Sequence, residues 1–241
     1  MRIKKEYIKD YYENEAPKYN YTHGAGMLGA QISIDRYYHS FLKKYINKNS
    51  KVLEVGCGTG VFTEVIKKLS NNIIATDISK NMLLEAKKRN PDVEFKEADI
   101  ENLPFKDQEF DLVIAINSFS YVPKKNKGIK EIQRVLKKNG KFLIIDMNFL
   151  SPVYYATFLL NFLKRTPWIR TTMQSNRFYL KKLFKKNNFR VLELFESNFI
   201  PHRATKKTAK FFYVPLDNLS KAIPLIKPLS MRVFIAGEKI G

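Results

Sequence analysis

Apolar runs of strand length alternate with amphipathic helical patterns through the middle of the chain. The runs fall at 52–55, 73–77, 93–100, 110–117 and 140–146, and the helical patterns between them at 61–69, 79–89 and 128–139. Runs of this length that are rich in Val, Ile and Leu are typical of strands buried in a parallel sheet. Their alternation with helices predicts an α/β fold with right-handed crossovers.

The last third of the chain continues this pattern with more interruptions. We expect a helix at 175–188, a sixth strand at 189–195 and a seventh, hairpin-like strand at 231–238. Segment 200–230 is punctuated by Pro201, Pro215, Pro224 and Pro228 and is interpreted as an insertion rather than a second domain. The apolar run at 149–163 is too short and interrupted to span a bilayer. It is either a lid helix over a pocket or an interfacial amphipathic helix.

Glycines follow the first predicted strand at alternate positions. Gly56 allows the chain to turn at the end of the strand, and Gly58 leaves room for a ligand to approach the backbone. Gly60 allows close packing where the next helix begins, and the free N–H groups there favour an electron-rich group. A tight turn without a ligand is the alternative. The third glycine comes one residue earlier than in the dinucleotide-binding pattern, which argues against an NAD site.

Acidic and amide side chains end the following strands. Asp77 lies about 20 residues after the glycines, where a carboxylate accepts hydrogen bonds from a ribose diol; it is alternatively an N-cap for the helix at 79–89. Asp99 and Ile100 close the third strand, and Asn117 ends the fourth. Because the carboxyl ends of parallel strands share one edge, these residues predict a ligand site there.

Together, VLEVGCGTG at 52–60 and these strand ends resemble the motifs of class I S-adenosylmethionine-dependent methyltransferases. The resemblance implies a Rossmann-like, seven-stranded, mostly parallel sheet with helices on both faces, an N-terminal helical flap and a substrate-side insertion. It implies that the backbone at Gly56 and Gly58 holds the methionine part of the cofactor and that Glu54 orients its amino end. Asp77 would bind the ribose, and Asp99 the adenine amino group.

Other positions complete the cofactor site that the resemblance implies. Ile78 and Met82 would flank the adenine, with Ile100 beside it, and Asn117 would lie near the reactive sulfonium. The full set of candidate cofactor-binding residues is Tyr11, Tyr19, Glu54, Gly56, Cys57, Gly58, Gly60, Asp77, Ile78, Met82, Asp99, Ile100 and Asn117.

The N-terminal segment YYENEAPKYN at 11–20 resembles the lead-in of small-molecule methyltransferases, including quinone and sterol types, although Tyr-Glu and Tyr-Asn replace the usual Tyr-Asp pairs. Its tyrosines either cover the cofactor and exclude water or simply pack the flap onto the core. With 44% hydrophobic and 27% charged residues, the composition is that of a globular protein. We therefore expect one domain over 1–241: a flap (1–48), a cofactor-binding core (49–147), and a lid, insertion and last strands (148–241).

The chain is strongly basic, with a formal net charge of +20 and a sequence pI near 9.8. Such a charge favours nucleic acid, anionic lipid or phosphorylated metabolites as partners, unless it reflects a lysine-rich proteome. Positive residues are densest at 164–232. Cys57 is the lone cysteine, no Cys/His cluster has metal-ligand spacing, and the N-terminus lacks an apolar signal core. We expect a cytoplasmic protein without a bound metal, with peripheral association at an anionic membrane as an option.

Methyl transfer needs alignment more than acid–base catalysis, although an oxygen or carbon nucleophile can require a base. His202 is our first candidate among the histidines, which also include His23 and His39, and Tyr121 is a substrate-facing candidate. Asn117 is followed by Ser118 and Phe119, without the prolines typical of adenine methyltransferases of nucleic acids. We expect a small-molecule or lipid-type acceptor; an RNA methyltransferase and a non-catalytic cofactor-binding regulator are the alternatives, and the oligomeric state is left open.

Overall fold

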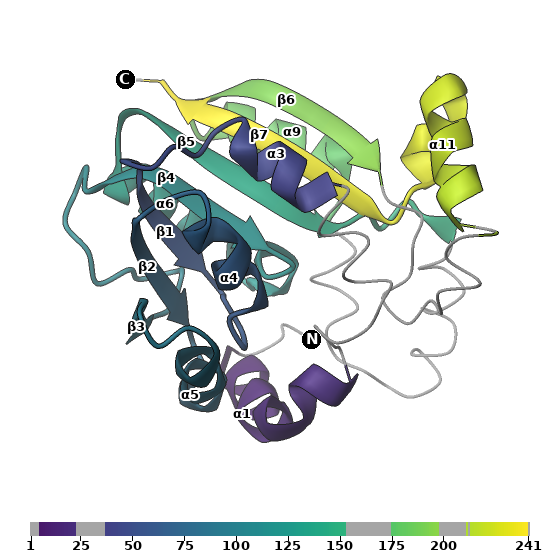
Figure 1. The fold of residues 1–241 in the computed structure, drawn as a ribbon. Coiled ribbons are helices and arrows are strands. Elements are labelled where there is room, and N and C mark those ends of the chain that lie inside the picture. Colours follow the sequence, from purple (N-terminus) through teal and green to yellow (C-terminus); the bar gives the residue numbers. More distant parts are fainter. Residues whose placement is uncertain (1–4, 23–36, 153–174, 198–210, 212, 241) are drawn as a thin grey trace.

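A seven-stranded sheet forms the centre of the computed structural model, which describes residues 5–22, 37–152, 175–197, 211 and 213–240 (Figure 1). The strand order is β3-β2-β1-β4-β5-β7-β6. Strands β1 to β5 pair in parallel, whereas β7 runs antiparallel to both β5 and β6. The predicted Rossmann-like sheet and its hairpin-like last strand are therefore confirmed.

The strands are β1 (Lys51–Val55), β2 (Asn72–Asp77), β3 (Glu94–Glu97), β4 (Phe110–Ile116), β5 (Leu136–Met147), β6 (Phe189–Ser197) and β7 (Arg232–Lys239). The helices are α1 (Lys5–Thr22), α3 (His39–Lys43), α4 (Val61–Lys67), α5 (Lys80–Arg89), α6 (Lys125–Val135), α9 (Arg177–Lys186) and α11 (Val214–Ala222), with short 3-10 helices η2 (Phe119–Tyr121) and η4 (Pro224–Leu229).

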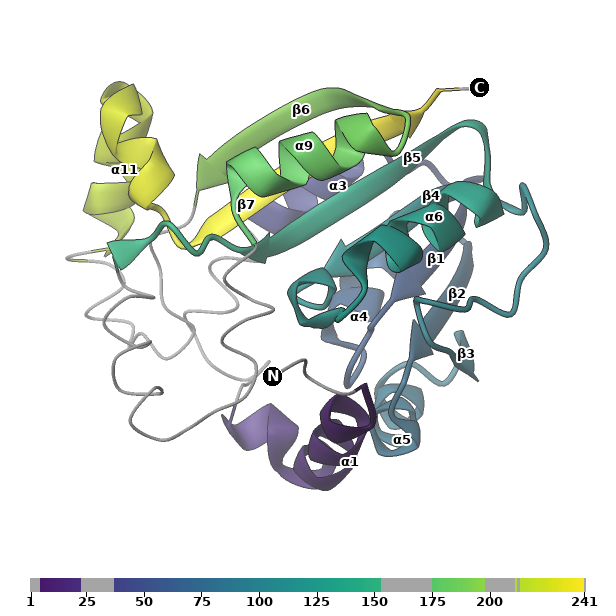
Figure 2. The same cartoon turned by 180° about the vertical axis from the view of Figure 1, so that it is seen from behind.

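Helices cover both faces of the sheet, so the molecule has two apolar layers. On one face α3, α4 and α5 pack through residues such as Phe41, Ile66 and Ala86. On the other face, seen in Figure 2, α6 and α9 pack through residues such as Ile132 and Phe184. Strands buried on both sides explain why their sequences read as nearly continuous apolar runs. Helix α3 lies within the range expected for the flap, yet it packs in the core.

The predicted boundary between the fourth helix and fifth strand was wrong. We expected a helix at 128–139, but α6 ends at Val135 and β5 begins at Leu136. Leu136 is fully buried and pairs with Phe110 of β4, and the β4–β5 register then shifts before Leu112 pairs with Lys141. Asn139 then adopts a left-handed backbone with φ 61°. Pairing with β4 therefore overrides the helical propensity of the lysines.

The third strand is also shorter than expected. It ends at Glu97 rather than at residue 100, because the Asp99 carboxylate accepts the N–H of Glu101 at 2.9 Å and the Asp99 carbonyl accepts the N–H of Asn102 at 2.8 Å. These bonds turn the chain away from β2. Asp99 is thereby held on a loop at the carboxyl edge of the sheet.

The segment before β7 contains η4 and α11. Helix α11 packs on η4, which packs on β6. Because β7 begins at Arg232 opposite the end of β5, η4 enters β7 at the carboxyl edge of the parallel strands (Figure 1). The 149–163 run lies almost wholly outside the described residues, so both interpretations of it stay predictions. Within the described parts of the chain, no helix combines the length and apolar character needed to cross a membrane.

Candidate functional site

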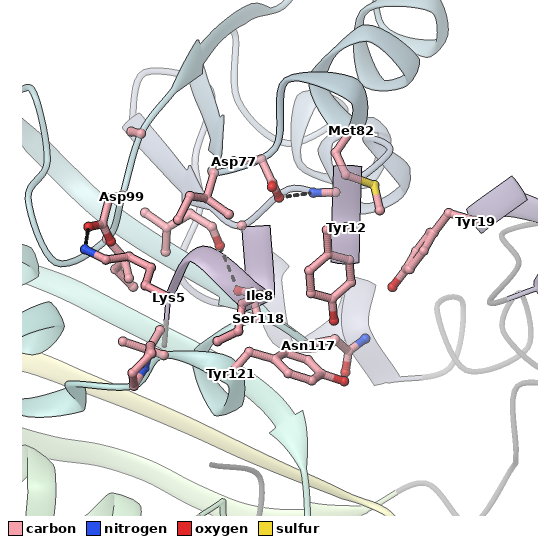
Figure 3. A pocket seen from close by; sticks show the side chains of 18 residues that line it. Lys5, Ile8, Tyr12, Tyr19, Asp77, Met82, Asp99, Asn117, Ser118 and Tyr121 are labelled. Atoms are coloured by element: carbon pink, nitrogen blue, oxygen red, sulfur yellow. Dashed lines mark hydrogen bonds and ion pairs between the residues drawn. The ribbon is translucent and has the colours of Figure 1, made fainter. Parts of the chain in front are cut away.

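A pocket opens at the carboxyl edge of the sheet, where the strand order reverses between β1 and β4 (Figure 3). It holds about 770 Å³ of empty space, its open mouth included, which suits a small-molecule ligand. Ligands of open α/β sheets bind at this reversal point, because the connecting loops leave it in opposite directions. The lining residues are Lys5, Ile8, Tyr12, Tyr19, Val55, Gly56, Gly58, Asp77, Ile78, Met82, Ala98, Asp99, Ile100, Asn117, Ser118, Tyr121, Val122 and Pro123.

The glycine loop after β1 forms the floor of the pocket. Gly56 has φ +70°, and a Cβ there would lie 2.4 Å from the Cβ of Ser118. Gly60 has φ +77°, and a Cβ there would lie 3.0 Å from the Cα of Ala86 on α5. At Gly58, with φ +55°, a Cβ would meet nothing within 4 Å, because this residue faces the open pocket. Glycine is thus needed for packing at two positions and for ligand access at the third.

Asp77 ends β2 with its carboxylate against the glycine loop. One oxygen accepts the N–H of Gly58 at 2.8 Å and the other accepts the N–H of Ser79 at 3.0 Å. Burial raises the pKa of this carboxyl, and the two N–H groups oppose that rise. The N-cap of α5 is Ser79, whose hydroxyl accepts the N–H of Met82. The N-cap alternative for Asp77 is therefore wrong, and its carboxylate faces the pocket.

Asp99 faces the pocket from the loop after β3, and α1 covers it. The Lys5 ammonium forms an ion pair with Asp99 and lies 3.8 Å from the Glu101 carboxylate. These contacts raise the pKa of Lys5, chiefly through its hydrogen bond to Asp99. Lys5 therefore occupies a hydrogen-bonding position of Asp99 in the lining of the pocket (Figure 3). Ile78 and Ile100 line the same pocket.

Helix α1 is fastened to the core through the N-terminus of α5. The Glu13 carboxylate accepts the N–H groups of Lys80 and Asn81, each at 2.9 Å, and the Ser79 hydroxyl at 3.1 Å. The N-terminus of a helix favours a carboxylate through its unpaired N–H groups and its dipole. These bonds to the charged form hold the pKa of Glu13 below its usual value against the opposing effect of burial. The flap thus closes directly over the pocket.

Tyrosines form the wall opposite the glycine loop. Tyr12 makes edge-to-face contacts with Tyr19 and Tyr121, with ring centroids 6.2 Å and 5.8 Å away. Burial raises the pKa of Tyr12 well above its usual value, and burial raises that of Tyr19 to about 12. Both hydroxyls therefore stay protonated at neutral pH. Tyr11 contacts Tyr12 edge-to-face at 5.3 Å but does not line the pocket.

Asn117 joins this wall in an unusual backbone conformation. It directly follows β4 with φ 52°, a left-handed conformation that an amide residue tolerates better than most. Its N–H donates to the carbonyl of Ile145 at 2.7 Å, which fixes the backbone. Its side-chain oxygen is buried and has no hydrogen-bond partner within the described structure. A buried orphan acceptor beside a pocket is suited to receive a hydrogen bond from a ligand.

The loop that carries Ser118, Tyr121 and Pro123 is held by buried charges. The Asp146 carboxylate at the end of β5 accepts the N–H of Ser120 at 2.6 Å. The Lys125 ammonium donates to the carbonyls of Ser120 and Val122 at 2.8 and 3.1 Å. Burial lowers the pKa of Lys125 to about 8 against the attraction of Asp146. These buried contacts hold the loop in place beside the pocket.

Glu54, Cys57 and Gly60 lie behind the pocket rather than in its lining. The Glu54 carboxylate is 2% exposed and accepts the Thr63 hydroxyl at 2.5 Å. Burial raises its pKa to about 7, with a smaller contribution from the charge of Asp77. The Cys57 thiol is buried, and burial raises its pKa well above the usual value, as expected for a packing residue. These residues support the glycine loop.

The structure thus gathers most of the candidate residues into one pocket: Tyr19, Gly56, Gly58, Asp77, Ile78, Met82, Asp99, Ile100, Asn117 and Tyr121. His39 lies on α3, away from this lining, while His23 and His202 fall outside the described residues. Sequence reasoning missed Lys5 and Ile8 on α1 and Ser118 after β4. The 3–4 residue spacing of Lys5, Ile8 and Tyr12 was a usable signal, because it places them on one helix face. Within the described residues, no group of three or more His, Cys, Asp or Glu side chains could hold a metal ion.

Comparisons with known proteins address this fold and pocket. The family model described as "Methyltransferase domain" matches residues 53–144, the range from β1 to β5 that supplies the glycine loop, Asp77, Asp99 and Asn117. Residues 53–144 form a methyltransferase domain. The resemblance to class I methyltransferases is thereby confirmed for this segment.

Relatives extend the similarity beyond the matched domain. A malonyl-[acyl-carrier protein] O-methyltransferase of Buchnera aphidicola is 38% identical over 130 residues, which are 54% of this chain and 50% of that protein. A ubiquinone/menaquinone biosynthesis C-methyltransferase of Campylobacter jejuni is 29% identical over 151 residues, 59% of this chain and 64% of that protein. The chain therefore spans about half to two thirds of the length of these curated relatives.

A solved structure supports the fold over nearly the whole chain. A SAM-dependent methyltransferase of Thermotoga maritima, described as a possible histamine N-methyltransferase, has a TM-score of 0.65 and 19% identity and covers 97% of this chain and 98% of its own. At this identity the likeness concerns the fold. The methyltransferase domain thus lies within a chain that has the methyltransferase fold throughout its described sheet.

Proposed function

We propose that this chain transfers a methyl group from S-adenosylmethionine to a small-molecule or lipid-type acceptor, releasing S-adenosylhomocysteine. The observation that carries the proposal is the convergence of Gly58, Asp77, Asp99 and Asn117 on one pocket at the strand-order reversal. These side chains and backbone groups come from four different strand ends. A pocket assembled in this way binds a ligand with several distinct polar groups.

The residues present fit the cofactor. Asp77 offers a carboxylate for a ribose diol, and at Gly58 the space where a side chain would begin is open to the ligand. Met82 and Ile78 provide apolar walls for a flat ring. The orphan oxygen of Asn117 offers an acceptor for a donor group of the ligand. The cofactor supplies an already activated methyl group. The chain's own task is then to orient the two reactants and to exclude water.

The tyrosine wall is suited to this task. Tyr12, Tyr19 and Tyr121 line the pocket with aromatic rings, a type of group that attracts a positive sulfonium, and they limit the entry of water. Because burial keeps the pKa values of Tyr12 and Tyr19 high, their hydroxyls act as hydrogen-bond donors rather than bases. His202 stays our candidate for a proton acceptor, should the acceptor atom need one, and Tyr121 stays our substrate-facing candidate.

The names of the relatives indicate the class of molecule that accepts the methyl group. One is named for a malonyl-[acyl-carrier protein] and another for quinone biosynthesis, so we infer an acceptor that is itself organic and small or carries an apolar chain. The net charge of +20 supports work at an anionic membrane surface from the cytoplasmic side. An RNA substrate and a non-catalytic regulator are alternatives that the same experiment separates.

The test uses S-adenosylmethionine with a labelled methyl group, incubated with the protein and a cell extract. Label in the organic-soluble fraction supports a lipid-type acceptor, and label in the aqueous fraction supports a small polar one. Label in the nucleic-acid fraction overturns the acceptor class, and absence of transfer despite cofactor binding favours the regulator. Asp77→Ala, with exposed Asp92→Ala as the matched control, should lose cofactor binding by calorimetry without unfolding; unchanged affinity would refute the site assignment.

A further inference from the structure

Exposed apolar side chains gather on one segment of the chain, 211–229. Of the eleven large apolar residues exposed in the described structure, six lie there: Phe211, Leu216, Leu219, Ile223, Leu225 and Leu229. Leu225 is 85% exposed and Phe211 is 65% exposed. Single exposed apolar residues are normal, but a group of this size marks an interaction surface. We call these six residues the α11–η4 apolar surface.

The geometry of α11 shows that this exposure is arranged rather than scattered. Leu216, Leu219 and Ile223 are three and four residues apart, so they lie on one side of the helix. A helix on a globular protein normally turns such a side toward the core. Among the described elements α11 makes its main contacts with η4, and it stands out from the sheet (Figure 1). Its apolar side therefore faces outward.

The charge of the surrounding sequence indicates what this surface contacts. Within the described part of this segment, 213–229, the sequence holds Lys221 and Lys227 against a single acid, Asp217, and the whole chain carries a formal net charge of +20. Exposed Leu, Ile and Phe next to basic residues are the signature of a segment that lies in the interface of an anionic bilayer. The positive charge would attract RNA as well, but RNA would not bury six apolar side chains. The combination favours lipid over nucleic acid.

The position of the segment agrees with this reading. Segment 211–229 leads into β7, whose first residue Arg232 pairs with Met147 at the end of β5. The α11–η4 apolar surface therefore projects from the carboxyl edge, the edge at which the pocket also opens (Figure 1). A protein docked through this surface holds that edge, rather than the opposite one, toward the bilayer.

We propose that the α11–η4 apolar surface, helped by the net positive charge of the chain, docks this protein on an anionic lipid bilayer. The proposal deepens the function above, because it says how a lipid-type acceptor would come within reach of the pocket. It concerns binding to lipid and does not itself require methyl transfer.

The test measures partition to vesicles of phosphatidylcholine alone and to vesicles containing phosphatidylglycerol. The full chain should bind the anionic vesicles more tightly, and added salt should weaken that binding. Leu219→Ser combined with Leu225→Ser should lower the partition coefficient at least about tenfold, and by about a hundredfold or more if both leucines are fully inserted. Leu84→Ser is the matched control, since Leu84 is 61% exposed but lies on α5, outside the surface; it should leave the partition coefficient unchanged.

A site-specific probe makes the result independent of overall affinity. Leu225→Cys and Leu84→Cys can each be labelled with an environment-sensitive dye, because Cys57 is buried. The dye at residue 225 should shift to the blue with anionic vesicles, and the dye at residue 84 should not. Equal shifts at both positions, or equal partition of the double variant and the Leu84→Ser control, would overturn the proposal.

Failure of the two proposals can be told apart. If Asp77→Ala loses cofactor binding but still binds vesicles, the docking proposal is supported independently of the proposed activity. Methyl transfer without any vesicle binding leaves the activity and overturns the docking surface. Capture of an acidic protein through the same leucines, with no binding to anionic vesicles, would replace lipid by a protein partner and also overturn it.

Discussion

The buried carboxyl of Glu54 makes the stability of this protein depend on pH in a defined window. Burial raises the Glu54 pKa from 4.5 to about 7, while in the unfolded chain the pKa keeps its ordinary value. Between these two values the folded protein binds more protons than the unfolded chain. The contribution of Glu54 to the free energy of unfolding therefore falls as pH rises from 4.5 to about 7 and is constant above that window.

The size of the effect follows from the same two values. A carboxyl pKa moved from 4.5 to about 7 corresponds to a loss of up to about 3 kcal/mol of stability above the window. Glu54→Gln removes the titration and keeps an oxygen to accept the Thr63 hydroxyl, which lies 2.5 Å from the carboxylate. We therefore expect the variant to gain stability relative to the wild type as pH rises.

The assay is urea unfolding of the cofactor-free protein, followed by circular dichroism at about pH 5 and about pH 8. The difference in unfolding free energy between Glu54→Gln and wild type should grow by up to about 3 kcal/mol from the lower to the higher pH. Glu94→Gln is the matched control, because the Glu94 side chain is 53% exposed. The control and the wild type should change in stability by the same amount between the two pH values. If Glu54→Gln also changes by the same amount as the wild type, burial of an ionisable Glu54 is the wrong explanation.

Three further predictions concern the pocket and its supports. Gly56→Ala should lower the free energy of urea unfolding by about 2 kcal/mol or more, because its Cβ would lie 2.4 Å from the Cβ of Ser118. Gly58→Ala should destabilise the protein less and act mainly on cofactor affinity, because a Cβ there meets open space. Equal losses of stability in the two variants would contradict this. Glu13→Gln should speed hydrogen exchange of α1 amides without affecting β4, in contrast to Asp10→Asn on the exposed side of α1; unchanged exchange would refute the fastening role. For Lys125, whose pKa burial lowers to about 8, the unfolded chain binds more protons above that pH, so wild-type stability should rise from pH 8 to about 10, and Lys125→Met should abolish the rise.

The core of the fold could be predicted from the sequence because its signals are local. Val52 to Val55 and the glycines after them specify a buried strand and a tight turn within nine residues. The boundary at Leu136 could not be predicted in this way, because it depends on pairing with Phe110. Helical propensity and sheet pairing compete at Lys137 and Lys138, and the long-range pairing decides.

The candidate site shows the same division. Gly58, Asp77 and Asn117 were found because strand ends of a parallel sheet must share an edge. Lys5 and Glu13 were missed because their partners lie far along the chain: Lys5 pairs with Asp99, 94 residues away, and Glu13 binds the α5 N-terminus more than 60 residues away. Nothing local distinguishes a lysine or glutamate that makes such a contact from one in solvent.

The contact between Lys5 and Asp99 also bears on how the pocket admits its ligand. One Asp99 oxygen accepts the N–H of Glu101, and the other carries the Lys5 ion pair. If Asp99 accepts a hydrogen bond from the adenine amino group, as the resemblance implies, the adenine and Lys5 compete for the second oxygen. Cofactor binding and the docking of the first turn of α1 are then linked, and each must weaken the other through this carboxylate. Glu13 is free of that competition, so the middle of α1 can stay fastened while its first turn yields.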